Sequence, residues 1–230
     1  MSRKKLIITA IILALVLAIG GILAYFTDVE EKENTFKTGK VDIEVIEENW
    51  PGNPDTPGGT PKTVDIVPGQ TVAKDPLVKN NGEGTVYAFV EIEVPKAKYK
   101  LVGENEISNT ARPLFKLLKG ASAAAAVEGI NDGWTLLSTD DTAADKIVYV
   151  YGYKTASETK VLTGLAKNTS TPKAFNYVKF ADVDEDSNTP AADSIQNKEY
   201  TVKVNGYGIQ TDGLPEGATA LEIFALAKGN

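Results

Sequence analysis

The chain contains no cysteine and no histidine among its 230 residues, and only one methionine. Without cysteine there are no disulfides, no thiolate zinc sites, no cysteine nucleophile and no lipid-modified cysteine anchor. Without histidine the chain lacks the usual general base near neutral pH and the commonest metal ligand. A serine–histidine relay and a His-Glu-x-x-His zinc site are therefore excluded. The fold must be stabilised by its hydrophobic core alone.

Basic residues are fewer than acidic ones, and the net charge of the chain is −7. Arg3, Lys4 and Lys5 are the charged residues of the first 24, so residues 25–230 carry a net charge of −10. An acidic surface of this kind repels nucleic acid and anionic lipid. Neither is expected as a partner.

The N-terminus has the three-part layout of a secretory signal peptide. Three basic residues are followed by an uncharged apolar run over 6–23, and the small residue Ala24 closes the run. Cleavage is predicted between Ala24 and Tyr25, which divides the chain into a signal peptide, 1–24, and one domain, 25–230. An uncleaved anchor is the alternative, because about 18 apolar residues just span a bilayer. No second hydrophobic run follows, so no membrane association is expected after cleavage.

The mature chain shows the alternation of short β-strands rather than the period of long helices. The clearest case is 85–94. The even-numbered residues from Val86 to Val94 share one face of the strand, and the odd-numbered residues from Tyr87 to Glu93 share the other. Pro95 is expected to end the strand. Further strands are predicted at 41–45, 64–67, 134–137, 147–153, 161–162, 175–180 and 200–209. One or two short helices are predicted over 112–129, and a closing helix over 218–227.

Turn residues separate these segments, for example Pro68-Gly69 and Asn80-Asn81-Gly82. Many short strands at this spacing indicate an antiparallel sandwich. The predicted fold is therefore all-β: an antiparallel, jelly-roll-like β-sandwich with short helical insertions, preceded by the helix of the signal peptide.

Three patterns invite a functional interpretation, and the first resembles a calcium loop. It begins with Asp182, Asp184 and Asp186, but Ser187 replaces the required glycine and Asp193 replaces the preferred glutamate. An acidic, solvated loop is the preferred interpretation, and no cofactor or metal is predicted.

The second pattern pairs Ser157-x-x-Lys160 with Lys37-Thr38-Gly39, two motifs of penicillin-binding enzymes. Their order is reversed and the middle motif is missing, so a chance match is preferred. The third pattern is the stripe formed by Tyr149, Tyr151 and Tyr153, which favours packing over a ligand platform.

Several motifs, taken in order, resemble those of the TasA/camelysin family. They are Ala24-Tyr25-Phe26-Thr27-Asp28, Asn34-Thr35-Phe36, Gly39 to Ile43, Asn49-Trp50, Pro68-Gly69, Lys74 to Gly82, Tyr87 to Val90, Trp134, Tyr149 to Tyr153 and Tyr207 to Gly213. Residues 98–130 and 182–198 match nothing in the family and are interpreted as insertions.

The resemblance implies a jelly-roll-like sandwich secreted by Gram-positive bacteria or their relatives. It implies a SipW-dependent signal peptide, removed by a dedicated signal peptidase, and a fibre subunit of the biofilm matrix. Some members are named as metallopeptidases. Because the chain has neither His nor Cys, a zinc site would need carboxylates alone, which suit harder ions. No enzymatic activity is predicted.

The sequence thus favours a secreted structural protein of the extracellular matrix or cell surface that polymerises by donor-strand exchange. Residues 25–36 would add a strand to the next subunit, with Tyr25, Phe26, Val29 and Phe36 as the assembly residues. The expected partners are further copies of the chain and an accessory or anchoring matrix protein. The alternatives are a secreted metallopeptidase, a monomeric surface-binding domain, and a loose N-terminus without a role.

The predicted processing has a direct test. N-terminal sequencing of protein recovered from the culture medium should read Tyr25-Phe26-Thr27-Asp28. Protein that stays in the membrane with Met1 or Ser2 at its start would instead show an uncleaved anchor.

Overall fold

The computed structural model describes residues 40–51, 63–184, 195 and 198–229. The predicted signal peptide, the cleavage site at Ala24 and Tyr25, and the segment 25–36 lie outside the described residues. No helix in the described part of the chain is long and apolar enough to cross a membrane.

The first layer of the fold is an antiparallel sheet whose central strand is β4 (Val86–Ala97). On one side β4 pairs with β9 (Lys146–Tyr153), which pairs with β8 (Trp134–Asp140). On the other side it pairs with β12 (Lys203–Gln210). The two-residue strands β10 (Gly164–Leu165) and β5 (Arg112–Pro113) pair with the two ends of β4.

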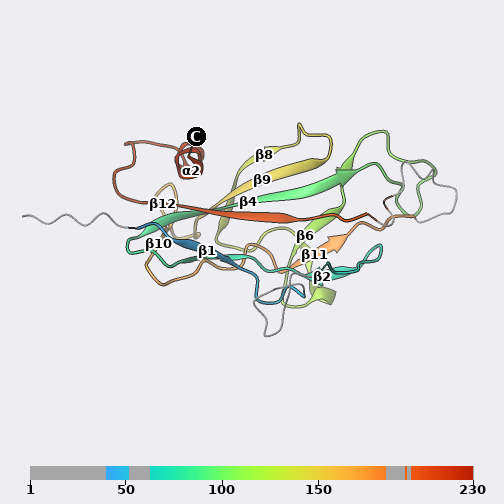
Figure 1. The fold of residues 1–230 in the computed structure, drawn as a ribbon, viewed down its shortest axis with the longest axis horizontal. Helices are drawn as coiled ribbons and strands as arrows, with labels where there is room; N and C mark the ends of the chain where they lie inside the picture. The colour runs from blue at the N-terminus through green and yellow to red at the C-terminus, as the bar shows by residue number, and fades with distance from the viewer. Residues whose placement is uncertain (1–39, 52–62, 185–194, 196–197, 230) are drawn as a thin grey trace, which may run out of the picture. The chain divides into compact units, whose positions relative to one another are not determined.

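The second layer contains two smaller antiparallel sheets, which Figure 1 shows together on the same face of the first. One has the strand order β2 (Thr71–Ala73), β11 (Tyr177–Phe180), β6 (Phe115–Lys119) and β7 (Val127–Glu128). The other pairs β1 (Ile43–Ile46) with β3 (Leu77–Asn80). The predicted all-β antiparallel sandwich is therefore confirmed.

Strand β4 is buried on both faces. Its inner side chains, Val86, Ala88, Val90, Ile92 and Val94, are at most 1% exposed and belong to the main core between the layers. On the opposite face Phe89 is fully buried in a second cluster with Val150, Leu162, Ile223 and Phe224. The two-sided alternation predicted for 85–94 is thus correct, and each face packs against a different part of the chain.

The second cluster is covered by the helix α2 (Ala220–Lys228), which confirms the closing helix predicted over 218–227. Thr219 and Glu222 form a capping box at its start. At its end Lys228 Nζ lies 2.6 Å from Glu91 Oε2, and Glu91 is largely buried in β4. This ion pair holds the last turn of the helix on the outer face of the sheet.

The helices predicted over 112–129 are wrong for most of that range. Residues 115–119 form β6, and the helical part is a single 3-10 turn, η1 (Ala123–Ala125). Phe115 and Leu117 face the core while Lys116 is exposed, which is a strand period, and β11 supplies the hydrogen-bonded partner. Pairing with a distant strand outweighs the helical propensity of leucine and alanine.

Strand β4 also continues beyond Pro95, where it was expected to end. The Pro95 carbonyl accepts a hydrogen bond from Leu114 N, so the missing N–H of Pro95 would point to the same side of the strand. On that side the pairing with β12 stops at Glu93, and the pairing with β5 starts at Lys96. The proline therefore lies where β4 changes partners and needs no donor. Residues 64–67 and 161–162 are not strands either.

Glycines in β12 let the two layers approach closely at one edge. A Cβ at Gly206 would lie 2.5 Å from Val45 Cγ2, and one at Gly208 would lie 2.7 Å from Ile43 Cγ2. Valine and isoleucine are stiff at χ1, so β1 has little freedom to move its side chains away. Strand β1 therefore packs directly on the backbone of β12.

We expect Gly206→Ala to destabilise the domain by about 1–3 kcal/mol, because the added methyl group overpacks the contact with Val45. Gly84→Ala is the matched control, since a Cβ there would meet nothing within 4 Å. Urea unfolding of the two variants measures the difference. Equal unfolding midpoints for both variants would contradict the close packing of β1 on β12.

Candidate functional site

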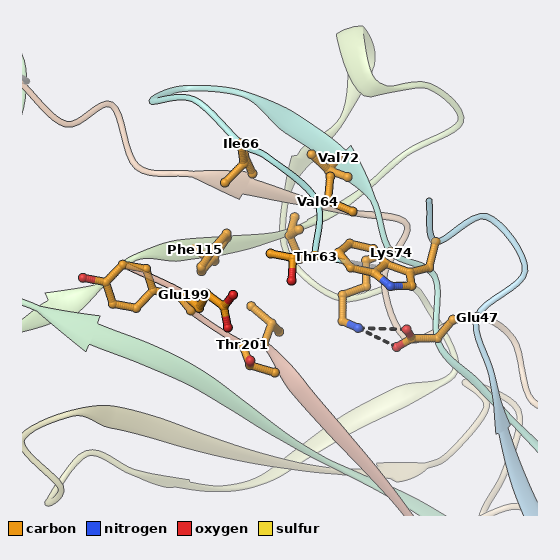
Figure 2. A pocket seen from close by; sticks show the side chains of 13 residues that line it. Glu47, Thr63, Val64, Ile66, Val72, Lys74, Phe115, Glu199 and Thr201 are labelled. Carbon is orange, nitrogen blue, oxygen red and sulfur yellow. Dashed lines mark hydrogen bonds and ion pairs between the residues drawn. The ribbon is translucent and has the colours of Figure 1, made fainter. Parts of the chain in front are cut away.

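The described residues enclose a partly open pocket of about 510 Å³ between the two layers. We call it the Trp50 pocket. It is lined by Glu47, Trp50, Thr63, Val64, Ile66, Val72, Lys74, Phe115, Val178 and residues 199–202. Figure 2 shows Val72 and Lys74 on one side, and Glu199 and Thr201 across the opening from them. Most of the lining is apolar, so the pocket suits aliphatic or aromatic side chains.

A charged pair borders the apolar lining. Lys74 Nζ lies 2.8 Å from both carboxylate oxygens of Glu47, as Figure 2 shows. The same ammonium group lies 5.0 Å from the centre of the Trp50 ring, within the range of a cation–π interaction. Lys74 is only 7% exposed, so its charge is satisfied by these two neighbours rather than by solvent.

Asp75, the next residue, fixes the position of Trp50. Its carboxylate accepts hydrogen bonds from Asn49 N at 3.0 Å and Asn49 Nδ2 at 2.6 Å, and pairs with Lys173 Nζ at 2.7 Å. Burial of Asp75, which is 2% exposed, by itself raises its pKa. The hydrogen bonds from Lys173 and Asn49 outweigh that effect, so the pKa of Asp75 lies below its usual value.

Two described segments that border the pocket belong to no β-ladder. Residues 63–66 and 199–202 lie outside any ladder formed by strands that the structure describes. Residues 199–202 lead directly into β12, whose pairing with β4 begins at Lys203. An apolar opening with unpaired backbone beside it has the properties of a site for an added β-strand.

The assembly residues predicted from the sequence, Tyr25, Phe26, Val29 and Phe36, lie outside the described residues, as does Lys37-Thr38-Gly39. Ser157 and Lys160 are exposed, and no hydrogen bond joins them in the described part of the chain. The Lys160 amide instead donates to the carboxylate of Glu158 at 2.8 Å.

The predicted acidic loop is described in part. Asp182 pairs with Lys179 at 3.0 Å and Asp184 with Lys100 at 2.8 Å, while Asp186 and Asp193 lie outside the described residues. Both described carboxylates thus have lysine partners. The solvated loop without calcium stays a prediction.

The tyrosine stripe packs as predicted. Tyr149, Tyr151 and Tyr153 lie against the main core from the inner face of β9. Burial, with a smaller contribution from Tyr149, raises the pKa of Tyr151 to about 12. These side chains therefore serve the packing between the layers.

The Trp50 pocket was not predicted, although motifs that carried the family resemblance meet there. Asn49-Trp50 comes from the first block and Lys74-Asp75 from the second. The antiparallel register of β1 with β3, in which Ile46 opposes Leu77, brings these two blocks together. The presence of both motifs in the sequence was the available indication of this site, but only the strand pairing shows that the two motifs are in contact.

The fold and the pocket define a β-sandwich with an apolar opening between its layers. The model of the camelysin metallo-endopeptidase family, which includes TasA, matches residues 3–112 of the chain. The match confirms the predicted resemblance and supports a secreted protein. It covers the Glu47, Trp50 and Lys74 side of the pocket, whereas Phe115 and residues 199–202 lie outside it. No protein of curated function matches the chain.

The family description implies a metal, and the residues present do not fit zinc. The sequence offers neither imidazole nor thiolate, the ligands that zinc prefers. In the described ranges no three Asp or Glu side chains gather in a way that could hold a metal ion. These residues therefore provide no basis for a catalytic step through a metal.

We expect Asp75→Asn to cost about 2–4 kcal/mol of stability at pH 7, because Lys173 loses its charged partner and Asn49 loses one acceptor oxygen. A depressed folded-state pKa contributes stability above the unfolded-state value and loses it as the pH falls through the folded value. The difference between wild type and variant should therefore be full at neutral pH and shrink as the pH falls below 3.8, the usual pKa of aspartate.

Urea unfolding at several pH values measures this difference. Asp42→Asn is the control, since Asp42 forms an exposed pair with Lys40 and its loss should leave the unfolding midpoint unchanged. A difference between wild type and Asp75→Asn that stays constant from pH 7 to pH 2 would contradict the assigned charge state.

Proposed function

We propose that the mature chain is a structural subunit of the extracellular matrix that polymerises into fibres by donor-strand exchange. The observation that carries the proposal is the Trp50 pocket, an apolar opening bordered by two segments that take part in no ladder among the described residues. The TasA/camelysin resemblance supports the same function. Residues 25–36 supply the donor strand, which signal peptidase frees by cutting before Tyr25.

The chemistry of this assembly is backbone pairing and side-chain burial. An inserted strand would pair with the free groups of 63–66 or 199–202, and Phe26, Val29 or Phe36 would occupy the apolar lining. Each subunit then supplies one donor segment and one acceptor pocket. Such a head-to-tail contact does not close on itself, so it produces filaments rather than dimers. The uncleaved signal peptide keeps the donor at the membrane, which confines assembly to the outside of the cell.

Deletion of 25–36 is expected to leave a folded, soluble monomer that forms no fibres under negative-stain electron microscopy. Because this truncated subunit keeps its pocket, it should accept a donor from wild-type protein and then stop growth. Mixing it with wild type should therefore shorten the fibres in proportion to its fraction. Fibres of normal length from the truncated protein, alone or in mixtures, would show that 25–36 is a terminus without a role in assembly.

The family description favours a second candidate, a secreted metallopeptidase. A casein-cleavage assay of the purified mature protein, with and without chelator, separates the two functions. The structural role predicts no chelator-sensitive cleavage, whereas cleavage that chelation abolishes and added metal restores would establish the peptidase. A monomer in size-exclusion chromatography at every concentration would favour a surface-binding domain instead.

A further inference from the structure

The Trp50 pocket presents two carboxylates with different surroundings. Glu47 is bound by Lys74 through both oxygens. Glu199 has no hydrogen-bond or ion-pair partner among the described residues, and its carboxylate points into the pocket (Figure 2). Solvent satisfies Glu199 while the pocket is open, because the residue is exposed. A strand that fills the opening removes that solvent, and the carboxylate then requires a cationic partner.

The segment 25–36 contains one cationic side chain, that of Lys32. Its other charged residues are acidic, namely Asp28, Glu30, Glu31 and Glu33. In a β-strand, alternate side chains share a face, so Lys32, Asn34 and Phe36 point to the same side. A strand that buries Phe36 in the apolar lining therefore also presents Lys32 on the side that faces the pocket wall, about 13 Å away along the strand.

We propose that Lys32 of one subunit forms an ion pair with Glu199 of the next, and that this pair sets the register of the donor strand. The inference rests on the proposed function, because it concerns the same pocket and the same donor segment. It adds one residue of the donor strand and one residue of the acceptor pocket that together fix the register of the inserted strand. Phe36 and the apolar lining supply affinity, and the Lys32–Glu199 pair supplies position.

Alternative registers are disfavoured by the sequence itself. A slip of one residue turns both Lys32 and Phe36 away from the pocket. A slip of two residues places either Glu30 or Asn34 against Glu199, which gives like-charge repulsion in the first case and a buried carboxylate without a counter-charge in the second. Lys74 cannot attract these acidic residues without giving up Glu47, which it holds at 2.8 Å. One register therefore satisfies the charges and buries the aromatic ring together.

The test uses the mature secreted protein, residues 25–230, and charge exchange. Lys32→Glu and Glu199→Lys should each lower the rate of fibre growth, followed by light scattering, by about tenfold or more, in keeping with coupling energies measured at desolvated charge pairs. The double variant Lys32→Glu/Glu199→Lys should recover to within about threefold of wild type. Glu31→Lys and Lys198→Glu are the matched controls, since they change neighbouring charges but not this pair, and should grow like wild type.

A mixture of the two single variants gives the sharpest result. The donor strand of the Lys32→Glu variant is complementary in charge to the pocket of the Glu199→Lys variant. The donor strand of the Glu199→Lys variant keeps its lysine, and the pocket of the Lys32→Glu variant keeps its glutamate, so this second contact is complementary as well. The mixture should therefore form fibres at nearly the wild-type rate although each variant alone does not. This recovery also shows that both variants are folded, because a misfolded subunit does not copolymerise.

Two results would overturn the pairing, and they differ in what else they overturn. Single variants that assemble like wild type, or a mixture and a double variant as slow as the singles, would refute the Lys32–Glu199 pair and leave donor-strand assembly intact. Wild-type protein that forms no fibres would refute the proposed function and this pair with it.

Discussion

A β-sandwich must fill the space between its sheets with side chains, and this constraint governs the molecule. Along most of β4 the space is filled, since Val90 and Ile92 are fully buried between the layers. At the Trp50 pocket the described residues leave it open, although Trp50, Phe115 and Val178 already line it with apolar surface. Exposed apolar surface costs about 25 cal/mol for each Å² that remains in contact with water. Insertion of a strand would remove that cost, which gives the proposed assembly its driving force.

The polar network around the pocket keeps this opening in shape. Asp75 ties Asn49, next to Trp50, to Lys173 on a distant segment, and Lys74 joins Glu47 to the Trp50 ring. Each of these groups would be costly to leave unpaired, because Lys74 and Asp75 are almost fully buried. The network therefore holds this wall of the pocket in place, and under the proposed function it would keep the opening ready for an inserted strand.

The strands β4, β9 and β12 could be predicted from the sequence, because side chains that point alternately to the two faces of a strand leave a period of two in the residue types. The prediction failed where pairing with a distant strand determines the secondary structure. The leucines of β6 and the alanines that follow it favour a helix, but pairing with β11 makes this segment a strand. The sequence predicted that Pro95 ends its strand, because proline has no N–H to donate to a neighbouring strand. The strand continues because Pro95 lies between the pairing with β12 and the pairing with β5, where no donor is needed. The pocket was beyond prediction since Trp50, Phe115 and Glu199 are brought together by pairings between distant segments.

Amide hydrogen exchange at 63–66 and 199–202 tests the central claim, that the Trp50 pocket accepts a strand from another copy. In the described residues these segments take part in no ladder, so their amides should exchange rapidly in the monomer that lacks 25–36. In polymerised wild type at least one of the two segments should become strongly protected at alternate residues, as pairing with an added strand requires. Equally rapid exchange in monomer and polymer would contradict the account.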